Sequence, residues 1–241
     1  MTGVAAKINR RGACPALAAP MQTGDGLLAR LNPVSQGLTA KQLIGLCKSA
    51  ETHGNGIVEI TARGSIQIRG LTSASAVELG EDVNGLSIDV QTGTVVANGP
   101  LAGLDRQEKA DPRQLASMIR NALSQRGLSG KLAPKVSVVV DGGGLWRLDS
   151  LQADVRCTAV GAESWHVEIA SEGASTRPLG TFSIEQTCEI ALHVLEELAK
   201  LGRTARARDL PGPTEEVRSG LHENPLGSLE LDGSRKAVAV A

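Results

Sequence analysis

The chain contains only three aromatic rings, Trp146, Trp165 and Phe182, among 241 residues. Its core must therefore be built from Val, Leu, Ile and Ala, and 41% of the residues are hydrophobic. That share, with 25 Lys and Arg against 26 Asp and Glu, excludes a disordered chain and a protein that binds polyanions through its net charge. Proteins that bind single-stranded nucleic acid stack bases on aromatic rings, so we expect no nucleic acid partner.

No stretch of the sequence reaches the roughly 18 to 20 apolar residues of a membrane-spanning helix, so we expect no membrane partner. The basic N-terminus lacks the long apolar segment of a secretory signal peptide. The cysteines, at positions 14, 47, 157 and 188, form no C-x-x-C pair and suggest neither a zinc site nor a disulfide scaffold. The histidines show no paired metal spacing. We therefore expect a cytoplasmic protein with reduced thiols and no metal ligands.

The segment from Ala19 to Gln91 combines helix and strand signals. Thr39, with Gln42 three residues later, opens a helix whose apolar residues recur at helical spacing until Gly54 ends it. β-branched residues between turn-forming glycines predict the neighbouring strands. These strands are expected at residues 27–31, 57–61, 66–69 and 86–90. The order of elements predicts a small α+β unit.

A second unit is expected from about residue 94 to residue 202. Asp111, followed by a proline, begins an amphipathic helix, and Ser183 with Gln186 opens a long helix near the end of the unit. Three apolar runs between these helices predict strands. The strands are expected at residues 136–140, 155–160 and 165–170. Helices and strands in this order predict an α/β domain.

The last part of the chain has a different composition. Arginines and prolines between residues 203 and 213 suit a linker. The sequence stops in an apolar, strand-like run at residues 237–241, with no turn or polar tail behind it. Such a strand has nothing to pair with, so we expect that a following segment is missing from this sequence.

Several motifs carry a resemblance to known proteins. They lie at residues 11–15, 19–21 and 23–28, at the T-x-R-x-x-x-Q signature of residues 61–67, and at residues 100–104, 132–135 and 141–144. The first three resemble the N-terminus of the precorrin-3B synthase family. The T-x-R-x-x-x-Q signature resembles the ferredoxin-like half-domain of the wider sulfite and nitrite reductase superfamily, and the later motifs resemble the start of its larger cofactor domain.

This resemblance implies a fold and a division into domains. Members of the superfamily contain two copies of a unit that consists of a small domain followed by a large domain. The implied fold is α+β, with a ferredoxin-like half-domain at residues 1–91 and a sulfite/nitrite reductase-type α/β domain at residues 92–202. Residues 203–241 would be a linker and the start of a second half-domain. The chain then resembles an N-terminal half, truncated before the second repeat is complete.

The resemblance also points to four substrate-binding residues. Arg63 lies in the expected turn, while Gln67 and Arg69 project from one face of the following strand because their positions have the same parity. Lys135 stands where the resemblance implies a lysine that faces an anionic ligand. The implied substrate, the tetrapyrrole precorrin-3A, carries carboxylates that a guanidinium can bind bidentately. The alternatives are the solvent-facing side of an antiparallel sheet and, for Lys135, an ordinary solvated lysine.

The cofactors implied for the complete family enzyme are a 4Fe–4S cluster and iron. A cubane cluster needs four thiolates, which the superfamily supplies as C-x5-C and C-x3-C in its second large domain. The cysteines of this chain do not have that spacing. We therefore expect that this chain alone ligates neither cofactor, and that a companion chain carries the second repeat.

The implied function is that of a partial precorrin-3B synthase-like oxidoreductase of cobalamin biosynthesis, oxygenating precorrin-3A with O2 and a reductant. Two positions depart from the superfamily pattern: Ser137 replaces a second basic residue of the reductases, and Thr94-Val95 replaces an Arg-Asn pair. One alternative is a fragment of an assimilatory sulfite or nitrite reductase that uses sirohaem, which Ser137 disfavours. The other is a non-catalytic half that binds a tetrapyrrole or assembles with a partner.

Overall fold

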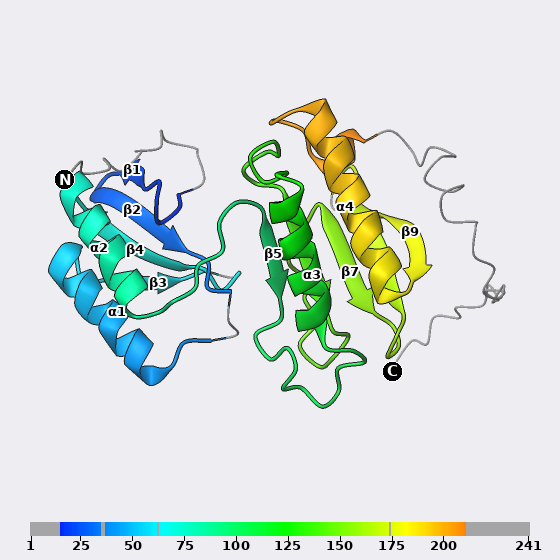
Figure 1. Cartoon of the computed structure of the whole chain (residues 1–241), viewed down its shortest axis with the longest axis horizontal. Coiled ribbons are helices and arrows are strands. Elements are labelled where there is room, and N and C mark those ends of the chain that lie inside the picture. Colours follow the sequence, from blue (N-terminus) through cyan, green and yellow to red (C-terminus); the bar gives the residue numbers. More distant parts are fainter. Residues whose placement is uncertain (1–14, 35–36, 62, 174, 211–241) are drawn as a thin grey trace, which may run out of the picture. The chain divides into compact units, whose positions relative to one another are not determined.

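The computed structural model describes residues 15–34, 37–61, 63–173 and 175–210, which form two β-sheets with two helices on one face of each (Figure 1). Some of the sequence-based expectations concern other parts of the chain. Cys14, the end of the expected linker and the strand-like run at residues 237–241 lie outside the described residues. The expected start of a second half-domain does so as well.

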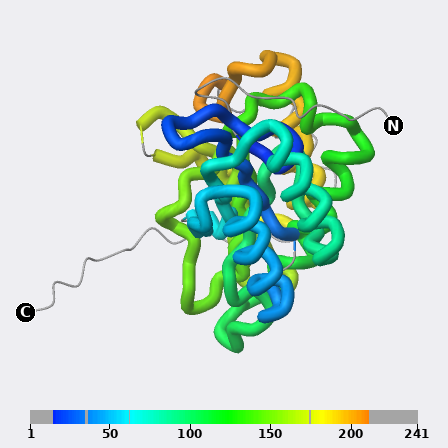
Figure 2. Tube along the Cα trace, turned by 90° about the vertical axis from the view of Figure 1, so that its left-hand side faces the viewer, coloured from blue at the N-terminus to red at the C-terminus, as the bar shows by residue number. Residues whose placement is uncertain are grey.

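The first sheet has four antiparallel strands in the order β1-β2-β4-β3. The strands are β1 (Met21–Thr23), β2 (Gly26–Leu31), β3 (Val58–Ile60) and β4 (Ile66–Leu71). Helices α1 (Ala40–His53) and α2 (Ser73–Gly85) lie side by side over one face of this sheet (Figures 1 and 2). Leu46 of α1 and Leu79 of α2 are completely buried against Ile68 of β4, so an aliphatic core joins the helices to the sheet.

The predicted capping residues begin α1. The Thr39 hydroxyl accepts from Gln42 N, and the Gln42 side chain accepts from Thr39 N, which makes a complete capping box. The strand predicted at residues 86–90 is wrong. Leu86 caps the C-terminus of α2, Ser87 has a positive φ of 54°, and Val90 forms only an isolated bridge with Pro33.

The second sheet has five strands in the order β5-β6-β7-β8-β9. Strands β5 (Val95–Asn98), β6 (Ser137–Asp141) and β7 (Val155–Ala159) are parallel, whereas β8 (Trp165–Ala170) and β9 (Thr176–Phe182) continue the sheet antiparallel. Helices α3 (Pro112–Gln125) and α4 (Ile184–Leu201) pack on one face, and a 3₁₀ turn, η1 (Ala207–Asp209), contacts β8. All five residues of β6 and all five of β7 are buried, so these two strands form the centre of the sheet.

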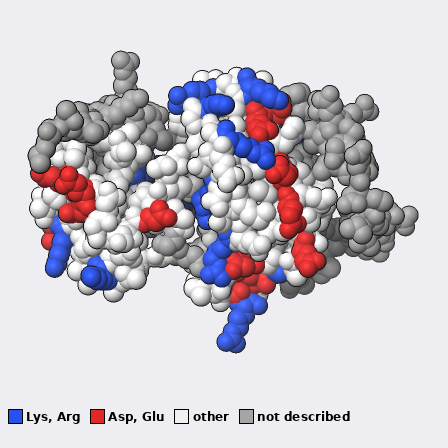
Figure 3. All heavy atoms as spheres, in the orientation of Figure 1, with Lys and Arg blue, Asp and Glu red and all other residues white. Residues whose placement is uncertain are grey.

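The observed elements confirm the predicted α+β fold class. The predicted helices at α1, α3 and α4 are present, with the predicted cap residues Thr39, Asp111 and Ser183. Within the described ranges, no helix combines the length and the apolar character needed to cross a membrane. Figure 3 shows acidic and basic side chains interspersed on the face that it presents, as the nearly balanced composition leads one to expect.

Asp154, which precedes β7, is the most deeply buried charged side chain of the described residues, with 1% of its surface exposed. Its carboxylate accepts hydrogen bonds from Ser137 N at 3.0 Å, from Arg206 Nε and Nη2 at 2.9 Å, and from Ala207 N at 3.0 Å. A buried carboxylate is tolerated only when such partners compensate its lost hydration. Asp154 therefore ties the start of β6 to η1.

We predict that Arg206→Met lowers the free energy of unfolding by about 3 kcal/mol, because the buried carboxylate of Asp154 loses its ion-pair partner. Urea denaturation, followed by the fluorescence of the buried Trp165, measures this change. Arg208→Met is the matched control, since Arg208 is exposed and its Nε lies 3.8 Å from Asp209 Oδ1. It should change the stability by less than about 0.5 kcal/mol. Equal effects of the two variants would contradict the role given to Asp154.

The two described cysteines of the larger domain lie in its core. Cys157 on β7 is completely buried, and Cys188 on α4 is 5% exposed. Burial raises the pKa of the Cys157 thiol to about 12 and also raises the pKa of Cys188. Because the thiolate is the reactive form, both groups should be inert in the folded chain.

We predict that iodoacetamide at pH 8 leaves Cys157 unmodified in the native chain, since only roughly one thiol in ten thousand is ionised four pH units below its pKa. The half-buried Cys47 of α1 should be alkylated much faster. Peptide mass spectrometry after timed labelling compares the two sites, and labelling in urea provides the unfolded reference. Similar native rates at Cys157 and Cys47 would show that the core around β7 opens readily.

Candidate functional site

One face of the four-stranded sheet is polar. Ile66 and Ile68 of β4 point into the core, whereas Gln67 and Arg69 alternate with them and are half-buried on the other face. The sequence correctly predicts that these two residues share a face. With its amide oxygen directed at Arg30, Gln67 accepts from Arg30 Nε at 3.1 Å and from Nη2 at 2.7 Å. Gln67 thus orients a cation on the neighbouring strand β2.

Arg69 binds two carboxylates of its own domain. Its Nε lies 3.2 Å from Asp25 Oδ2 and its Nη1 lies 3.3 Å from Glu59 Oε2. Hydrogen bonds to Asp25 and Glu59 raise the pKa of Arg69. The Thr23 hydroxyl and, after it, Arg69 lower the pKa of Asp25. A ligand that uses Arg69 must therefore compete with these carboxylates.

Arg63 lies in the turn before β4 and makes contacts far away in the sequence. Its Nη1 donates to Ser137 Oγ at 3.1 Å, across 74 positions, and its Nη2 donates to the carbonyl of Gln152. Lys135 is exposed and stands two residues before Ser137. The structure therefore brings Arg63 to the segment that carries Lys135, while Gln67 and Arg69 contact charged residues of the first sheet. Substrate binding by all four residues stays a prediction.

Two cations lie in the segments that meet at the start of β6. Arg63 carries a planar guanidinium and Lys135 an ammonium, the two kinds of cation that bind carboxylates in proteins. Ser137, the position at which the resemblance implies a second base in reductases, provides a neutral hydroxyl that accepts from Arg63. The Ser137 backbone N–H is bound by Asp154, so the position of this strand end is well defined.

The described cysteines do not fit an iron–sulfur cluster. Cys47, Cys157 and Cys188 lie on three different elements, and Cys157 is held as a neutral thiol by burial. Among residues 15–34, 37–61, 63–173 and 175–210, no group of three or more His, Cys, Asp or Glu side chains is placed to hold a metal ion. No chemical step at a cluster is therefore assigned to these residues.

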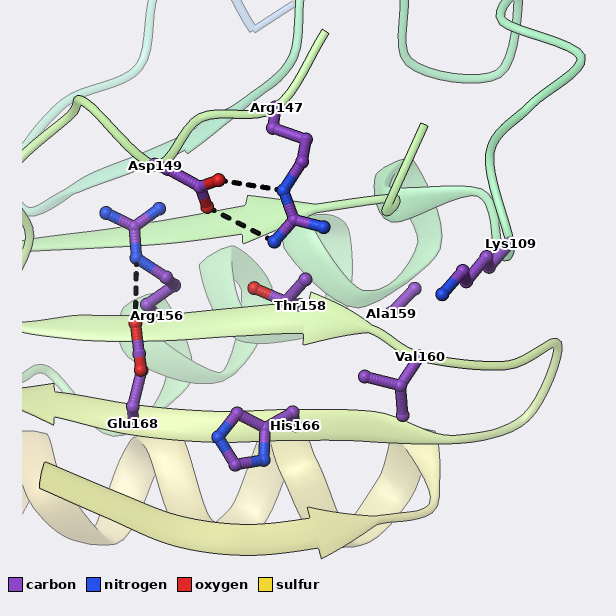
Figure 4. Close-up of a pocket in the computed structure, with 9 residues that line it drawn as sticks. All are labelled: Lys109, Arg147, Asp149, Arg156, Thr158, Ala159, Val160, His166 and Glu168. Carbon is purple, nitrogen blue, oxygen red and sulfur yellow. Dashed lines mark hydrogen bonds and ion pairs between the residues drawn. The ribbon is translucent and has the colours of Figure 1, made fainter. Parts of the chain in front are cut away.

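A cavity of about 230 Å³ lies on the face of the larger sheet opposite the helices (Figure 4). Strands β7 and β8 form its floor, and two loops border it. Its lining residues from the strands and the turn between them are Arg156, Thr158, Ala159, Val160, His166 and Glu168, and those from the loops are Lys109, Arg147 and Asp149. The cavity lies toward the C-terminal ends of β6 and β7, whereas Arg63 contacts the start of β6.

Two ion pairs organise the cavity. Arg156 Nε lies 3.2 Å from Glu168 Oε1, directly across the β7–β8 pair, and both side chains are largely buried. Arg147 binds Asp149 through Nε at 2.8 Å and Nη2 at 3.2 Å. This contact raises the pKa of Arg147 and lowers that of Asp149. The contact therefore favours the charged forms of Arg147 and Asp149.

The sequence reasoning missed this cavity, although one signal for part of it was available. Polar residues alternate with apolar ones along both predicted strands, as in Val155-Arg156-Cys157-Thr158 and Trp165-His166-Val167-Glu168. This period of two indicates one polar sheet face. The two cations from the loops carry no such signal. Their position depends on tertiary contacts, such as the hydrogen bond from Lys109 N to Gly142 O at 2.8 Å.

Comparisons with known proteins agree with this fold. Residues 19–84 match the family described as nitrite/sulfite reductase ferredoxin-like half domain. Precorrin-3B synthase of Sinorhizobium sp is 44% identical over 204 residues, which are 83% of this chain and 44% of that protein. Ferredoxin–nitrite reductase of Synechococcus elongatus is 28% identical over 138 residues, or 53% of this chain and 26% of that protein.

Among solved structures, the NirA protein of Mycobacterium tuberculosis superposes with a TM-score of 0.58 and 15% identity, covering 76% of this chain and 35% of that chain. This similarity concerns the fold alone. The chain spans less than half the length of each of these two curated relatives. The resemblance predicted from the motifs is confirmed: residues 19–84 match the nitrite/sulfite reductase ferredoxin-like half domain, and the chain is similar to precorrin-3B synthase over 83% of its length.

Proposed function

We propose that this chain is the tetrapyrrole-binding part of a precorrin-3B synthase-like oxidoreductase of cobalamin biosynthesis. The observation that carries the proposal is the 44% identity to precorrin-3B synthase over 83% of the chain. The identity extends through both sheets rather than through the half-domain alone. In the complete enzyme, precorrin-3A would be oxygenated with O2 and a reductant.

The geometry at the start of β6 supports binding of a carboxylated substrate. Precorrin-3A carries several carboxylates, and Arg63 and Lys135 provide the two kinds of cation that bind them. Arg63 is held by Ser137 Oγ and by the carbonyl of Gln152, so its guanidinium is oriented before a ligand arrives. Preorganisation of this kind lowers the entropic cost of binding. The role of these residues is to position the substrate.

The same site argues against a sulfite or nitrite reductase. A small inorganic anion needs several cations in close reach, because it offers few other contacts. Here the position two residues after Lys135 holds Ser137, whose hydroxyl accepts a hydrogen bond from Arg63 instead of adding a positive charge. A carboxylate on a large ligand gains further contacts from the rest of the molecule and needs fewer cations.

The proposal places the 4Fe–4S cluster and the iron of the complete enzyme on residues outside this chain, on a companion chain with the second repeat. The described cysteines are buried or isolated and do not fit a cluster. Alternatively, the chain is a non-catalytic half that binds the tetrapyrrole and assembles with such a partner. The catalytic and the non-catalytic assembly share the binding site and differ only in whether they convert the substrate.

We predict that Arg63→Ala weakens the binding of precorrin-3A to the full chain about tenfold or more, because a charge-assisted hydrogen bond contributes roughly 1.5–3 kcal/mol. Isothermal titration calorimetry measures the change. Lys135→Met should weaken binding similarly, and it tests the site without disturbing packing, since Lys135 is exposed. Arg203→Ala, at an exposed arginine after α4, is the control. Unchanged affinity in both site variants would refute the site.

We predict that the purified full chain, incubated anaerobically with Fe²⁺ and sulfide and then desalted, retains far less than one iron atom per chain. The physical reason is that a cluster requires four accessible thiolates. Assays of iron and of acid-labile sulfide provide the readout. The absorbance of the thiolate-to-iron charge-transfer bands provides a second one. Four iron atoms per chain, retained without a companion, would disprove the division of the cofactors.

A further inference from the structure

The cations of the cavity on β7 and β8 differ in how fully their donors are occupied. Each guanidinium nitrogen of Arg156 has a partner: Nη1 donates to Leu148 O at 2.8 Å, Nη2 donates to Leu151 O, and Nε faces Glu168. Arg147 binds Asp149 with Nε and Nη2, which leaves its Nη1 edge available. In Figure 4 this edge points away from Asp149, toward the side of the cavity where Lys109 lies.

Lys109 adds a second available donor. Its side chain has no hydrogen-bonding or ion-pair partner among the residues that the structure describes. Its ammonium is directed into the cavity from the loop above Ala159 (Figure 4). A lysine that lines a cavity without a carboxylate partner has all of its N–H donors available for a ligand.

Thr158, on the floor of the cavity, provides an independent indication of a ligand. The residue is only 8% exposed, and its hydroxyl has no hydrogen-bonding partner in the described part of the chain. Buried hydroxyls are nearly always hydrogen-bonded. Because Thr158 lines the cavity, a molecule held there can bond to its hydroxyl.

The balance of charge determines the sign of that molecule. Three cations, Lys109, Arg147 and Arg156, face two carboxylates, Asp149 and Glu168. Each carboxylate is engaged by an arginine, so neither is free to bind a cation. One positive charge and a set of donors are left over, which favours an anion.

The loop that carries Arg147 also has exposed apolar side chains. Leu145 and Trp146, directly before Arg147, are 62% and 65% exposed. Asp105 Oδ2 accepts from Leu145 N at 2.6 Å and so joins this loop to the loop of the exposed Leu104. Exposed apolar residues beside a polar cavity are typical of binding sites. They favour a carboxylate attached to an apolar body over an inorganic ion.

We infer that this cavity binds a carboxylate, with Lys109 Nζ and Arg147 Nη1 donating to its oxygens and the Thr158 hydroxyl donating beside them. The carboxylate belongs either to an arm of the tetrapyrrole, in which case the inference rests on the proposed function, or to a free dicarboxylate. The site is distinct from the one at Arg63. None of the cavity's lining residues contacts Arg63, which bonds instead to Ser137 and Gln152.

The test is calorimetric titration of the full chain with two probes, uroporphyrin as a carboxylated tetrapyrrole and succinate as a free dicarboxylate. Lys109→Met and Arg147→Met should each raise the dissociation constant of at least one probe about tenfold or more. Lys131→Met, at an exposed lysine outside the cavity, should leave it within about twofold. Thermal unfolding of each variant checks the fold. Lys109 has no partner to lose, so its variant remains informative if Arg147→Met is unstable.

Tryptophan fluorescence gives a second readout. Trp146 directly precedes Arg147, which lines the cavity, whereas Trp165 is 1% exposed in the core. Succinate should change the emission of the wild-type chain, and Trp146→Phe should abolish this response while succinate still binds. A response that persists in Trp146→Phe would place the ligand elsewhere.

The outcomes separate this inference from the proposed function. Uroporphyrin binding that depends on Arg63 and Lys135, but not on Lys109 or Arg147, overturns the cavity inference and leaves the proposed function standing. Succinate binding that depends on the cavity, without any tetrapyrrole binding, supports the inference and removes the proposed function. Failure of the wild-type chain to bind either probe, or equal weakening by Lys131→Met, overturns the cavity inference.

Discussion

The structure of the larger domain depends on two buried carboxylates at the ends of β6. At the start of the strand, Asp154 accepts from Ser137 N and binds Arg206. At its end, Asp141 accepts from Gly143 N at 2.8 Å and from Leu148 N at 2.7 Å. Each carboxylate organises a loop that would otherwise leave backbone donors unpaired in the interior. Strand β6 is thereby fixed at both ends.

Both candidate sites are attached to these fixed ends. Ser137, whose backbone binds Asp154, also accepts the hydrogen bond from Arg63. At the other end, Asp141 holds the loop of Arg147, and Gly142 O holds the backbone of Lys109. Cations that bind a carboxylate gain affinity when their positions are set before binding. One rigid strand can therefore position two cationic sites on different parts of the chain.

Local sequence signals predict the elements of this fold well where capping chemistry is strong. Thr39 with Gln42, Asp111 before a proline, and Ser183 with Gln186 mark three helices, and the structure confirms each. The sequence signals do not predict helix α2, because Thr72 pairs with Ser75, a weaker capping partner than Glu or Gln. The strand predicted at residues 86–90 fails because Ile88 N bonds back to Val83 O, which turns the chain after α2 and packs Ile88 into the core.

The candidate sites are less predictable, because tertiary contacts create them. Parity along β4 correctly places Gln67 and Arg69 on one face, but the carboxylates that occupy Arg69 come from the β1–β2 turn and from β3. The family motif singles out Arg63, yet its contact with Ser137 spans 74 positions. Only the alternation along β7 and β8 hints at the cavity, and no local pattern places Lys109 over it.

In the proposed function, the start of β6 and the Arg63 turn bind a carboxylated tetrapyrrole. Hydrogen exchange followed by mass spectrometry, on the full chain with and without precorrin-3A, tests this binding site. We expect slower exchange in the peptides that cover residues 63–67 and 131–137 when the ligand is bound. Unchanged exchange in both segments, at a ligand concentration that saturates binding, would contradict it.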